Sequence, residues 1–397
     1  MDVGRWTLDV GRCHLHTGNA ELIRFIRDRI SVTGPVSFAS FMEQALYHPE
    51  HGYYSSGRAV IGREGDYFTN VSVGPLFGRL MAAQFAEMWR LLGEPAEFVI
   101  VEQAASNGQF AHDVLAAAEV HHPAFFVALR YRIVEPFAAL RDRQRETLAA
   151  FFERVLWCES LERLEPFCGV HFSNELLDAM PVHLIRWAGS EWVERYVDHS
   201  DDGFVLIDRP IVGEALRKHV TRIPTPDFIG YETEVNRASE EWIGALAKKL
   251  VRGFLLAVDY GFARDEFYAP RRTSGTLQCR AQHRVVRSPF EQIGEADITA
   301  HVEWTSIVEA AERAGLLFMG FTDQHHFITG LLARDDGARI VEEQKPKMQR
   351  ALQTLLHPGL LGMKFQHLVL AKGVAATSAL SGLRFARVGR AALSPSS

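Results

Sequence analysis

Short apolar runs rich in Val, Ile and Leu recur along the chain from residue 97 onward, with amphipathic segments between them. Runs of this length that are apolar at nearly every position are typical of strands buried on both faces of a parallel sheet. Strands are therefore predicted at residues 97–103, 131–135, 155–159, 169–174, 253–259, 316–322 and 365–372. Helices are predicted between them, near residues 109–118, 137–150, 237–252 and 306–314. The alternation favours an α/β fold built on a doubly wound parallel sheet.

The chain before residue 95 carries helical patterns. Leu22, Ile26 and Ile30 recur at helical spacing, which predicts a helix over residues 21–30. Ser37 is placed to cap a second helix, and Pro75 suits the first turn of a third. Residues 1–20 have weak periodicity and are predicted to form a loose arm.

Two insertions interrupt the later alternation. Residues 182–187, 192–197 and 204–207 alternate apolar and polar positions between turn residues, which predicts a β-meander. Residues 262–300 hold six arginines with little apolar periodicity, and we expect a long polar loop that is functional or mobile. The predicted organisation is an arm and helix over residues 1–35, one domain over 36–375 and a disordered tail over 376–397. Within the domain we expect a helical part at 36–92, a core at 95–181 and 253–373, and insertions at about 182–235 and 262–300.

Composition narrows the class of protein. The 397 residues are 47% hydrophobic and 23% charged, an ordinary balance for a globular chain. A formal net charge of -6 gives no reason to expect binding to nucleic acid or to a membrane surface. The four cysteines are scattered without a C-x-x-C pair, so we expect reduced thiols in a cytoplasmic, bacterial protein. We also expect no membrane insertion, because no apolar run reaches the roughly 18 residues of a spanning helix.

A first candidate site follows the strand predicted at residues 97–103. This strand carries Glu102 and runs into a turn of small residues that ends at Gly108. The next predicted strand ends in a second carboxylate, Glu135. A strand, a small-residue turn, a helix and a second strand ending in an acid form a nucleotide-binding type of βαβ unit. The G-x-G-x-x-G pattern of dinucleotide sites is absent, and a buried strand followed by an Ala-rich turn remains the alternative.

A second candidate site follows the strand predicted at residues 169–174. Asn174 offers an amide, and Glu175 and Asp178 lie three residues apart on one expected turn. Paired carboxylates can bind a guanidinium in bidentate geometry, which suits an arginine substrate. The alternative is a capped helix start whose acids favour the helix N-terminus. Asp259 ends a further strand and is either a site residue or a partner of the arginines in the second insertion.

Other chemistries lack a signature. The pairs His121-His122 and His325-His326 have no acids or cysteines at metal-ligand spacing, so no metal site is expected. The chain contains no G-x-S-x-G elbow and no Walker A motif.

Together these segments resemble the MidA-like family of S-adenosylmethionine-dependent methyltransferases, which includes a mitochondrial assembly factor of respiratory complex I that dimethylates an arginine. The resemblance spans about residues 36–373. Its motifs are F-M-E-Q-A-L-Y-H-P-E-H-G-Y-Y from Phe41, G-D-Y-F-T from Gly65, F-S-N-E-L-L-D-A-M-P-V-H from Phe172, D-Y-G from Asp259, G-T-L from Gly275 and G-E-A-D-I-T-A-H-V from Gly294.

The resemblance implies a Rossmann-like methyltransferase sheet with N-terminal helices, inserted segments and S-adenosylmethionine as cofactor. It implies cofactor contacts from the loop and turns that carry Asp66, Thr69, Glu102, Ala104, Gly108, Glu135, Ser160, Leu161 and Asn174. Within that set, Glu135 falls on the ribose-binding acid, and Ser160 and Leu161 fall on the segment flanking adenine. Asn174, Glu175 and Asp178 fall near the methyl group.

Two departures from the family pattern stand out. Ala104 and Ser106 replace family glycines, and residues 71–74 lack a family Glu. The Cβ atoms at 104 and 106 either crowd the methionine part of the cofactor or demand φ angles that side chains disfavour.

The expected function is methyl transfer to a protein arginine, linked to the assembly of a respiratory-type complex. Glu175 and Asp178 are expected to hold the substrate, with Asn174 and Asp259 as second candidates for catalysis. A homodimer is also expected. Two alternatives stay open, a non-catalytic assembly chaperone and a small-molecule methyltransferase whose basic insertion binds an acidic ligand.

Overall fold

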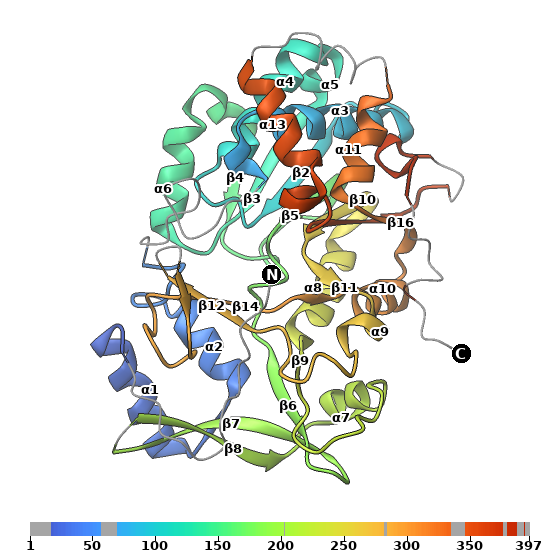
Figure 1. Cartoon of the computed structure of the whole chain (residues 1–397). Coiled ribbons are helices and arrows are strands. Elements are labelled where there is room, and N and C mark those ends of the chain that lie inside the picture. Colours follow the sequence, from blue (N-terminus) through green and yellow to red (C-terminus); the bar gives the residue numbers. More distant parts are fainter. Residues whose placement is uncertain are drawn as a thin grey trace.

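The computed structural model describes residues 17–56, 70–201, 203–281, 284–334, 346–375, 379–386 and 393 (Figure 1). Most of the expected N-terminal arm lies outside these residues, as do Asp66 and Thr69. Within the described part of the chain, no helix is long and apolar enough to cross a membrane.

A seven-stranded sheet forms the centre of the larger lobe (Figure 1). Its order is β16 (Leu317–Asp323), β17 (Gln366–Lys372), β10 (Leu250–Asp259), β5 (Phe167–Asn174), β2 (Phe98–Gln103), β3 (Leu129–Val134) and β4 (Val155–Cys158). All seven predicted strands are confirmed, and β10, β5, β2, β3 and β4 are parallel to one another.

The predicted parallel sheet has one exception in β17, which runs antiparallel to both of its neighbours. The reason lies in where the chain returns to the sheet. Gln366 opens β17 opposite Asp323, the last residue of β16, so the strand starts at the edge where its predecessor stops.

Helices cover both faces of this sheet because alternate strand residues point to opposite sides. Ile100 packs on one face against α3 (Leu76–Leu91), α4 (Gln109–His121), α11 (Gln324–Leu332) and α13 (Pro346–Leu356). Its neighbours Val99 and Val101 pack on the other face against α8 (Arg237–Lys249) and α10 (Trp304–Arg313). Helix α6 (Ala138–Thr147) lies on the β4 side of the sheet, and α5 (Pro123–Ala128) packs against α4 (Figure 1).

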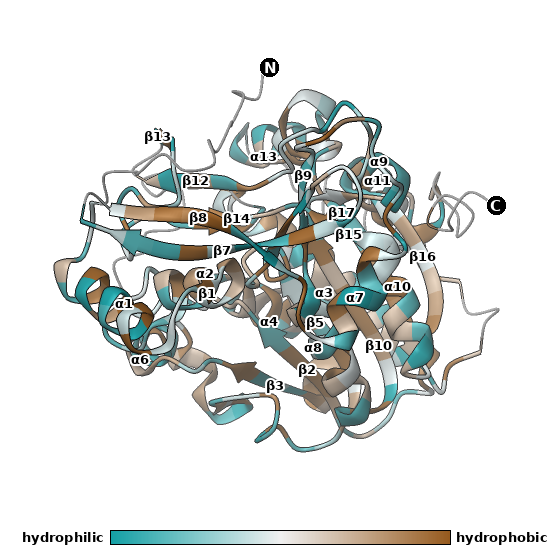
Figure 2. Ribbon diagram, turned by 90° about the horizontal axis from the view of Figure 1, so that it is seen from below, coloured by the Kyte–Doolittle hydropathy of each residue, from teal (hydrophilic) through white to brown (hydrophobic). Residues whose placement is uncertain are grey.

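A second lobe is built around a five-stranded antiparallel sheet (Figure 1). Its strands are β1 (Val36–Ser37), β6 (His183–Trp187), β7 (Trp192–Ser200), β8 (Gly203–Pro210) and β9 (Glu232–Val235). The predicted β-meander forms β6, β7 and β8. Helices α1 (Ala20–Thr33) and α2 (Phe38–Tyr47) pack on this sheet, and the Ser37 side chain caps α2 as predicted. Figure 2 shows hydrophobic colour along β8 and both colours on α1, as expected for elements with one buried face.

The second insertion is not the polar loop that its sequence predicts. It forms β11 (Gly261–Phe262), α9 (Arg264–Phe267) and a three-stranded sheet of β12 (Gln278–Ala281), β13 (Arg284–Val286) and β14 (Asp297–Thr299). Isolated apolar residues such as Cys279, Phe290 and Ile298 are buried against α2 and the meander. Burial by distant partners, not local periodicity, orders this segment.

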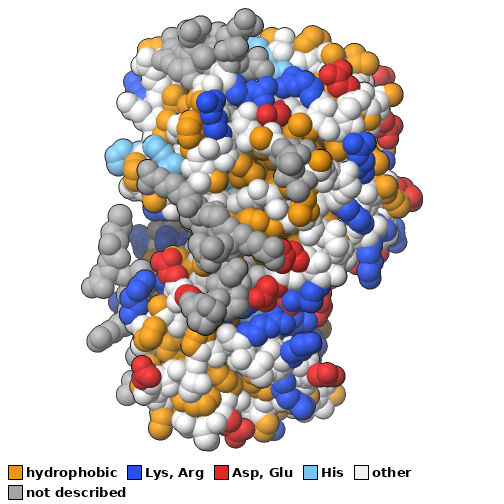
Figure 3. All heavy atoms as spheres, turned by 90° about the vertical axis from the view of Figure 1, so that its right-hand side faces the viewer, with side chains coloured by type: hydrophobic (Ala, Val, Ile, Leu, Met, Phe, Trp, Pro, Cys, Tyr) orange, Lys and Arg blue, Asp and Glu red, His pale blue; other side chains and the backbone are white. Residues whose placement is uncertain are grey.

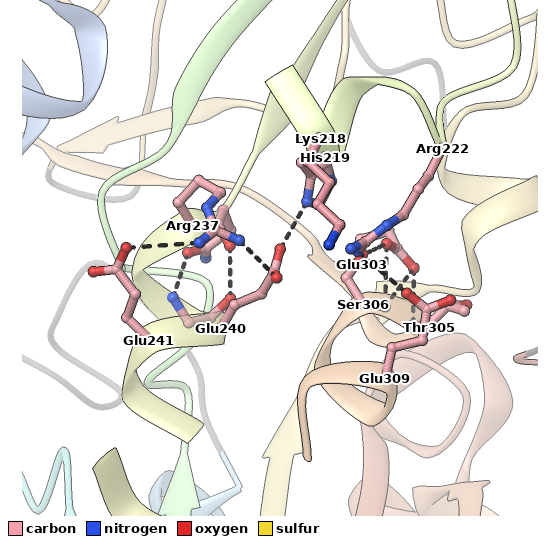
Figure 4. Close-up of polar contacts among 12 residues, drawn as sticks. Lys218, His219, Arg222, Arg237, Glu240, Glu241, Glu303, Thr305, Ser306 and Glu309 are labelled. Carbon is pink, nitrogen blue, oxygen red and sulfur yellow. Dashed lines mark hydrogen bonds and ion pairs between the residues drawn. The ribbon is translucent and has the colours of Figure 1, made fainter. Parts of the chain in front are cut away.

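Hydrogen bonds and ion pairs join the second lobe to the helices of the core (Figure 4). The Nδ1 atom of His219, on α7 (Glu214–Val220), lies 2.7 Å from the Oε1 atom of Glu240 on α8. Glu309 on α10 accepts from Arg264 at 2.8 Å and from Arg222 at 3.3 Å. Basic and acidic side chains lie interspersed on the face shown in Figure 3.

The end of the described chain differs from the predicted disordered tail. Residues 379–386 pack beside α3, where Ser381 donates to Glu87 at 2.8 Å and the Gly382 amide donates to Gln84 at 3.0 Å.

Candidate active site

A cavity of about 440 Å³ opens at the carboxyl ends of β2, β3 and β5. Three turns of the core line one side of it, and residues from the second lobe line the other. Of the predicted site residues, the cavity brings together Glu102, Ala104, Glu135, Asn174, Glu175 and Asp178. This edge of a doubly wound sheet is where ligands of such folds bind.

The turn after β2 is held in an unusual backbone conformation. Ala104 has a φ of 60° and Ser106 a φ of 49°, both in the left-handed region that favours glycine. Gly108 follows with a φ of 83° at the N-cap of α4 and lies outside the cavity lining. The replacement of family glycines by Ala104 and Ser106 therefore places residues with side chains in backbone conformations that favour glycine.

Gln144 joins this turn to the next one, and sequence reasoning missed it. Its Nε2 atom donates to the Ser106 carbonyl at 2.8 Å and to Glu135 Oε2 at 3.2 Å. Its Oε1 atom accepts from the Trp157 indole at 3.0 Å. No motif marks Gln144, because its partners lie on other elements.

Two carboxylates stand at the ends of β2 and β3. Glu102 accepts from the Tyr131 hydroxyl at 2.6 Å, and burial raises the pKa of Glu102 to about 8. Glu135 accepts from the Phe137 amide at 3.1 Å, and burial raises its pKa to about 7. A carboxylate at the end of the second strand can accept from ribose hydroxyls, as expected of Glu135.

The turn after β5 directs acidic side chains at the cavity. Glu175 has a φ of 56°, and its Oε1 atom accepts from Asn174 Nδ2 at 2.8 Å. Asn174 Oδ1 in turn accepts from Asn70 Nδ2 at 3.0 Å. Burial, followed by the nearby charge of Asp178, raises the pKa of Glu175 to about 8. The amide chain thus fixes one oxygen of Glu175.

Asp259 supports this turn from behind the cavity. Its Oδ2 atom accepts from the backbone amides of Leu176, Leu177 and Asp178 at 3.2, 2.9 and 3.3 Å. It lies outside the cavity lining, and these bonds give it a structural role that differs from both expected ones. Within the described part of the chain its carboxylate accepts from backbone amides, and Arg264 of the second insertion is bonded instead to Glu309.

Asp178 is a buried acid of the site whose two carboxylate oxygens differ in their hydrogen bonding. It is 3% exposed, its Oδ2 atom accepts from the Tyr260 hydroxyl, and burial raises its pKa to about 6. Among the described residues, its Oδ1 atom has no hydrogen-bond partner. A buried carboxylate oxygen without a partner is costly, so the site favours a donor from outside.

The second lobe contributes Tyr47, Tyr53, Tyr54 and Asp297 to the opposite side of the cavity. Sequence reasoning did not assign these residues to the site. Their signal was available, because Tyr47, Tyr53 and Tyr54 lie in the motif from Phe41 and Asp297 lies in the motif from Gly294.

Ser160 and Leu161 are not brought to the cavity lining. Leu161 is buried in the apolar cluster on the α8 side of the sheet. Their expected place beside adenine stays a prediction.

The cavity has a strongly acidic lining. Glu102, Glu135, Glu175, Asp178 and Asp297 all face it, and no Lys or Arg does among the described residues. Within that same part of the chain, no cluster of three or more His, Cys, Asp or Glu side chains is arranged to hold a metal ion.

Comparison with known proteins agrees with this geometry. Residues 80–322 match the Methyltransf_28 family of S-adenosyl-L-methionine-dependent methyltransferases. The mitochondrial protein arginine methyltransferase NDUFAF7 homolog of Drosophila melanogaster is 26% identical over 388 residues, covering 91% of this chain and 87% of its own. The human protein arginine methyltransferase NDUFAF7 is 23% identical, with coverages of 88% and 83%.

A solved structure has the same fold. A COG1565 superfamily member from Burkholderia thailandensis, bound to S-adenosyl-homocysteine, superposes with a TM-score of 0.83 at 32% identity. The match covers 94% of this chain and 98% of that chain. The expected fold, enzyme class and cofactor are confirmed: the chain belongs to the Methyltransf_28 family and is an S-adenosylmethionine-dependent methyltransferase.

Proposed function

We propose that this enzyme methylates a guanidinium nitrogen of an arginine in a protein that belongs to a respiratory-type complex. The observation that carries the proposal is the acidic cavity, which has five carboxylates and no Lys or Arg among its described lining residues. Burial holds several of these acids protonated in the ligand-free enzyme, and a cationic acceptor favours their ionised form, whereas an acidic ligand does not. The relatives named as protein arginine methyltransferases support the same acceptor.

The turn after β5 supplies the acceptor half of the reaction. S-adenosylmethionine, when bound, supplies an electrophilic methyl group. Asp178 and Glu175 hold the guanidinium and aim its nitrogen, and Asn174 keeps Glu175 oriented through the 2.8 Å bond. A nitrogen–carbon bond forms as the sulfur–carbon bond breaks, and the proton released from nitrogen passes to the Glu175 carboxylate. Negative charge beside the guanidinium stabilises the cation as the reaction proceeds.

The cofactor half lies on the turns after β2 and β3. Glu135 accepts from ribose hydroxyls, and the small side chains of residues 104–106 leave the backbone open to the methionine part. Asp66, Thr69, Ser160 and Leu161 complete this half in our proposal, on the strength of the family motifs.

One structural observation weakens the small-molecule alternative. That alternative relies on the arginines of the second insertion binding an acidic ligand. Arg264 is instead bonded to Glu309 at 2.8 Å, and Arg272 lies over the Phe262 ring at 4.0 Å. None of the six arginines of the insertion, all of which the structure describes, lines the cavity.

Labelling of proteins in a lysate tests the proposal. A lysate from a host lacking the gene is incubated with the enzyme and tritiated S-adenosylmethionine, and labelled proteins are hydrolysed to amino acids. We expect the label in methylated arginine. Label found only in another amino acid, or only in small molecules, would contradict the proposed acceptor. A reaction with the Glu175→Gln variant serves as the control for contaminating methyltransferases.

A further inference from the structure

The wall of the cavity opposite the core turns is a built structure of its own. Tyr47 ends α2, Tyr54 follows it in the chain, and Asp297 begins β14 of the three-stranded sheet. Helix α2 and strand β14 lie side by side below the central sheet (Figure 1). All three side chains line the cavity.

Hydrogen bonds and ring stacking fix this wall against the core. The Tyr47 hydroxyl donates to the carbonyl of Ala179, in the turn that carries Asp178, at 2.9 Å. The Tyr47 and Tyr54 rings stack with centroids 5.5 Å apart and planes inclined by 25°. The Tyr54 hydroxyl donates to Asp297 Oδ1 at 2.8 Å, and Asp297 is 3% exposed. An aromatic face and a desolvated carboxylate are therefore held beside each other.

A second observation indicates that this wall faces a missing donor. Asp178 Oδ1 is buried without a partner among the described residues, and Asp178 lines the same cavity from the core side. The charge of Asp297 acts on Glu175 as well as on Tyr47, so the carboxylates of both walls share one electrostatic environment. A group of buried acids in which one oxygen, Asp178 Oδ1, lacks a partner among the described residues is stabilised by a cation that carries N–H donors.

We propose that Tyr54 and Asp297 are specificity-determining residues that make the acceptor slot selective for the planar guanidinium of arginine, an inference that rests on the proposed function. The guanidinium plane lies against the tyrosine ring, while its N–H groups reach Asp297 on one wall and Asp178 on the other. Guanidinium is suited to this geometry because it stacks on aromatic faces and presents donors in a rigid fork. A lysine ammonium is attracted to an aromatic face as a compact charge but has no plane to stack on it and no rigid fork of donors, so the slot prefers arginine.

Direct binding of small probes tests the slot without relying on turnover. The full chain is saturated with S-adenosyl-homocysteine, and affinities for N-acetyl-arginine methylamide and for its citrulline and lysine counterparts are measured by ligand-observed NMR. Citrulline has the shape of arginine without its charge. We expect the parent enzyme to bind the arginine probe about tenfold or more tighter than the citrulline probe. Asp297→Asn should abolish most of that preference, and Tyr54→Phe, which keeps the ring, should reduce it severalfold.

Controls separate recognition from folding. Glu295→Gln removes an exposed acid two residues before Asp297 that lies outside the cavity lining, and it should keep the full preference. S-adenosyl-homocysteine affinity should be unchanged in all three variants. If it falls together with the preference, Asp297 and Tyr54 have only a structural role and the inference is wrong.

Two further outcomes would overturn the slot. If Asp297→Asn keeps the preference for the arginine probe over the citrulline probe, this wall does not determine which acceptor binds. The proposed function would be unaffected by that result. Equal binding of the arginine and citrulline probes by the parent enzyme would show that the slot is not a cation site. Because lysate labelling detects transfer and not binding of a free probe, it decides separately whether the proposed function survives that result.

Discussion

The turns after β2 and β5 leave the same edge of the sheet but serve the cavity in different ways. The β2 turn presents small side chains and open backbone, whereas the β5 turn presents the carboxylates Glu175 and Asp178. Both turns hold side-chain-bearing residues in the left-handed region, with φ values of 60° and 49° at Ala104 and Ser106 and 56° at Glu175. The two turns thus share a strained backbone and differ in what that backbone exposes.

The difference shows where strain is needed for function. Glycine would relieve the strain at residues 104 and 106 without removing any group that the cofactor half requires. Glycine at 175 would remove the carboxylate that faces the acceptor. Strain at Glu175 is therefore tied to the chemistry, and strain in the β2 turn is not. Substitutions in the two turns should have separable effects on cofactor binding and on methyl transfer.

The largest effect is expected from neutral variants of the β5 turn. Glu175→Gln and Asp178→Asn keep the shape of each side chain and remove its ability to ionise beside a bound cation. A guanidinium entering the site then lacks a carboxylate partner in a buried environment, where an unpaired charge is costly. Each variant should lower methyl transfer by on the order of a hundredfold while S-adenosylmethionine affinity stays nearly intact. Calorimetry gives the affinity and tritium transfer gives the turnover.

Two results would contradict this prediction. Full turnover in both variants would remove the carboxylates from the acceptor mechanism. Equal losses of S-adenosylmethionine affinity and turnover would place Glu175 and Asp178 in the cofactor half. The two turns would then not differ in function.

A smaller effect, confined to the cofactor, is expected at the end of β3. Glu135→Gln replaces a charged acceptor for ribose hydroxyls by a neutral one, a loss of roughly 1.5–3 kcal/mol. S-adenosylmethionine affinity should fall about tenfold or more. Transfer at saturating cofactor should change much less, since Glu135 does not touch the acceptor in our proposal. An unchanged dissociation constant in a folded variant would exclude Glu135 from the ribose site.

The sequence predicts the cofactor half better than the acceptor half. Glu102 and Glu135 end apolar β-branched runs, and the sheet rule alone places both at one edge. Tyr54 and Asp297 lie 243 residues apart in the chain and meet only because the second insertion folds on α2. The second insertion, which carries Asp297, lacks hydrophobic periodicity, since each of its short strands buries only a few apolar residues.

The family motifs could mark Tyr54 and Asp297 as important residues. Their spacing in the sequence could not show which side chains they contact in the folded protein. The same holds for Gln144, whose bonds to Ser106 and Glu135 connect two turns that the sequence treats separately. The role of Asp259 was equally hidden, because its partners are backbone amides and backbone amides leave no trace in a sequence.

The buried acids of both turns predict a pH dependence of stability. Burial raises the pKa of Glu102 and Glu175 to about 8 and that of Glu135 to about 7. In the unfolded chain these groups are already ionised at neutral pH, so the folded state holds the extra protons. Their stabilising contribution is fully present below the ordinary pKa of 4.5 and is lost as pH rises through the folded values, so the free energy of unfolding should fall up to about pH 8.

Buried histidines act at lower pH. Burial lowers the pKa of His171 and His367 to about 3. Their effect on the free energy of unfolding is an increase as pH rises from about 3 to 6.5, the ordinary pKa of histidine, and no change above that value. Urea denaturation of the ligand-free enzyme between about pH 6.5 and pH 8 follows the acids where these histidines no longer contribute. Glu102→Gln keeps an acceptor for Tyr131 and should flatten the decline. Constant or rising stability over this range in the parent enzyme would contradict the prediction.

The smallest effect, and the sharpest test of the comparison, comes from glycine. Ala104→Gly with Ser106→Gly removes two left-handed side-chain residues, each costing about 1 kcal/mol, and part of that gain is offset by the greater freedom of the unfolded chain. The double variant should be slightly more stable and should bind S-adenosylmethionine severalfold tighter, with transfer preserved. Equal or weaker binding would show that the turn is adapted to its residues and not impaired by them.

Glu175→Gly is the matched variant on the other turn. It relieves the same kind of backbone strain but removes the carboxylate, so methyl transfer should be lost as in Glu175→Gln. If strain relief alone governed activity, all the glycine variants would behave alike; if exposed charge governs it, only the variants at 175 lose transfer. Urea denaturation and tritium transfer on the same preparations distinguish the two.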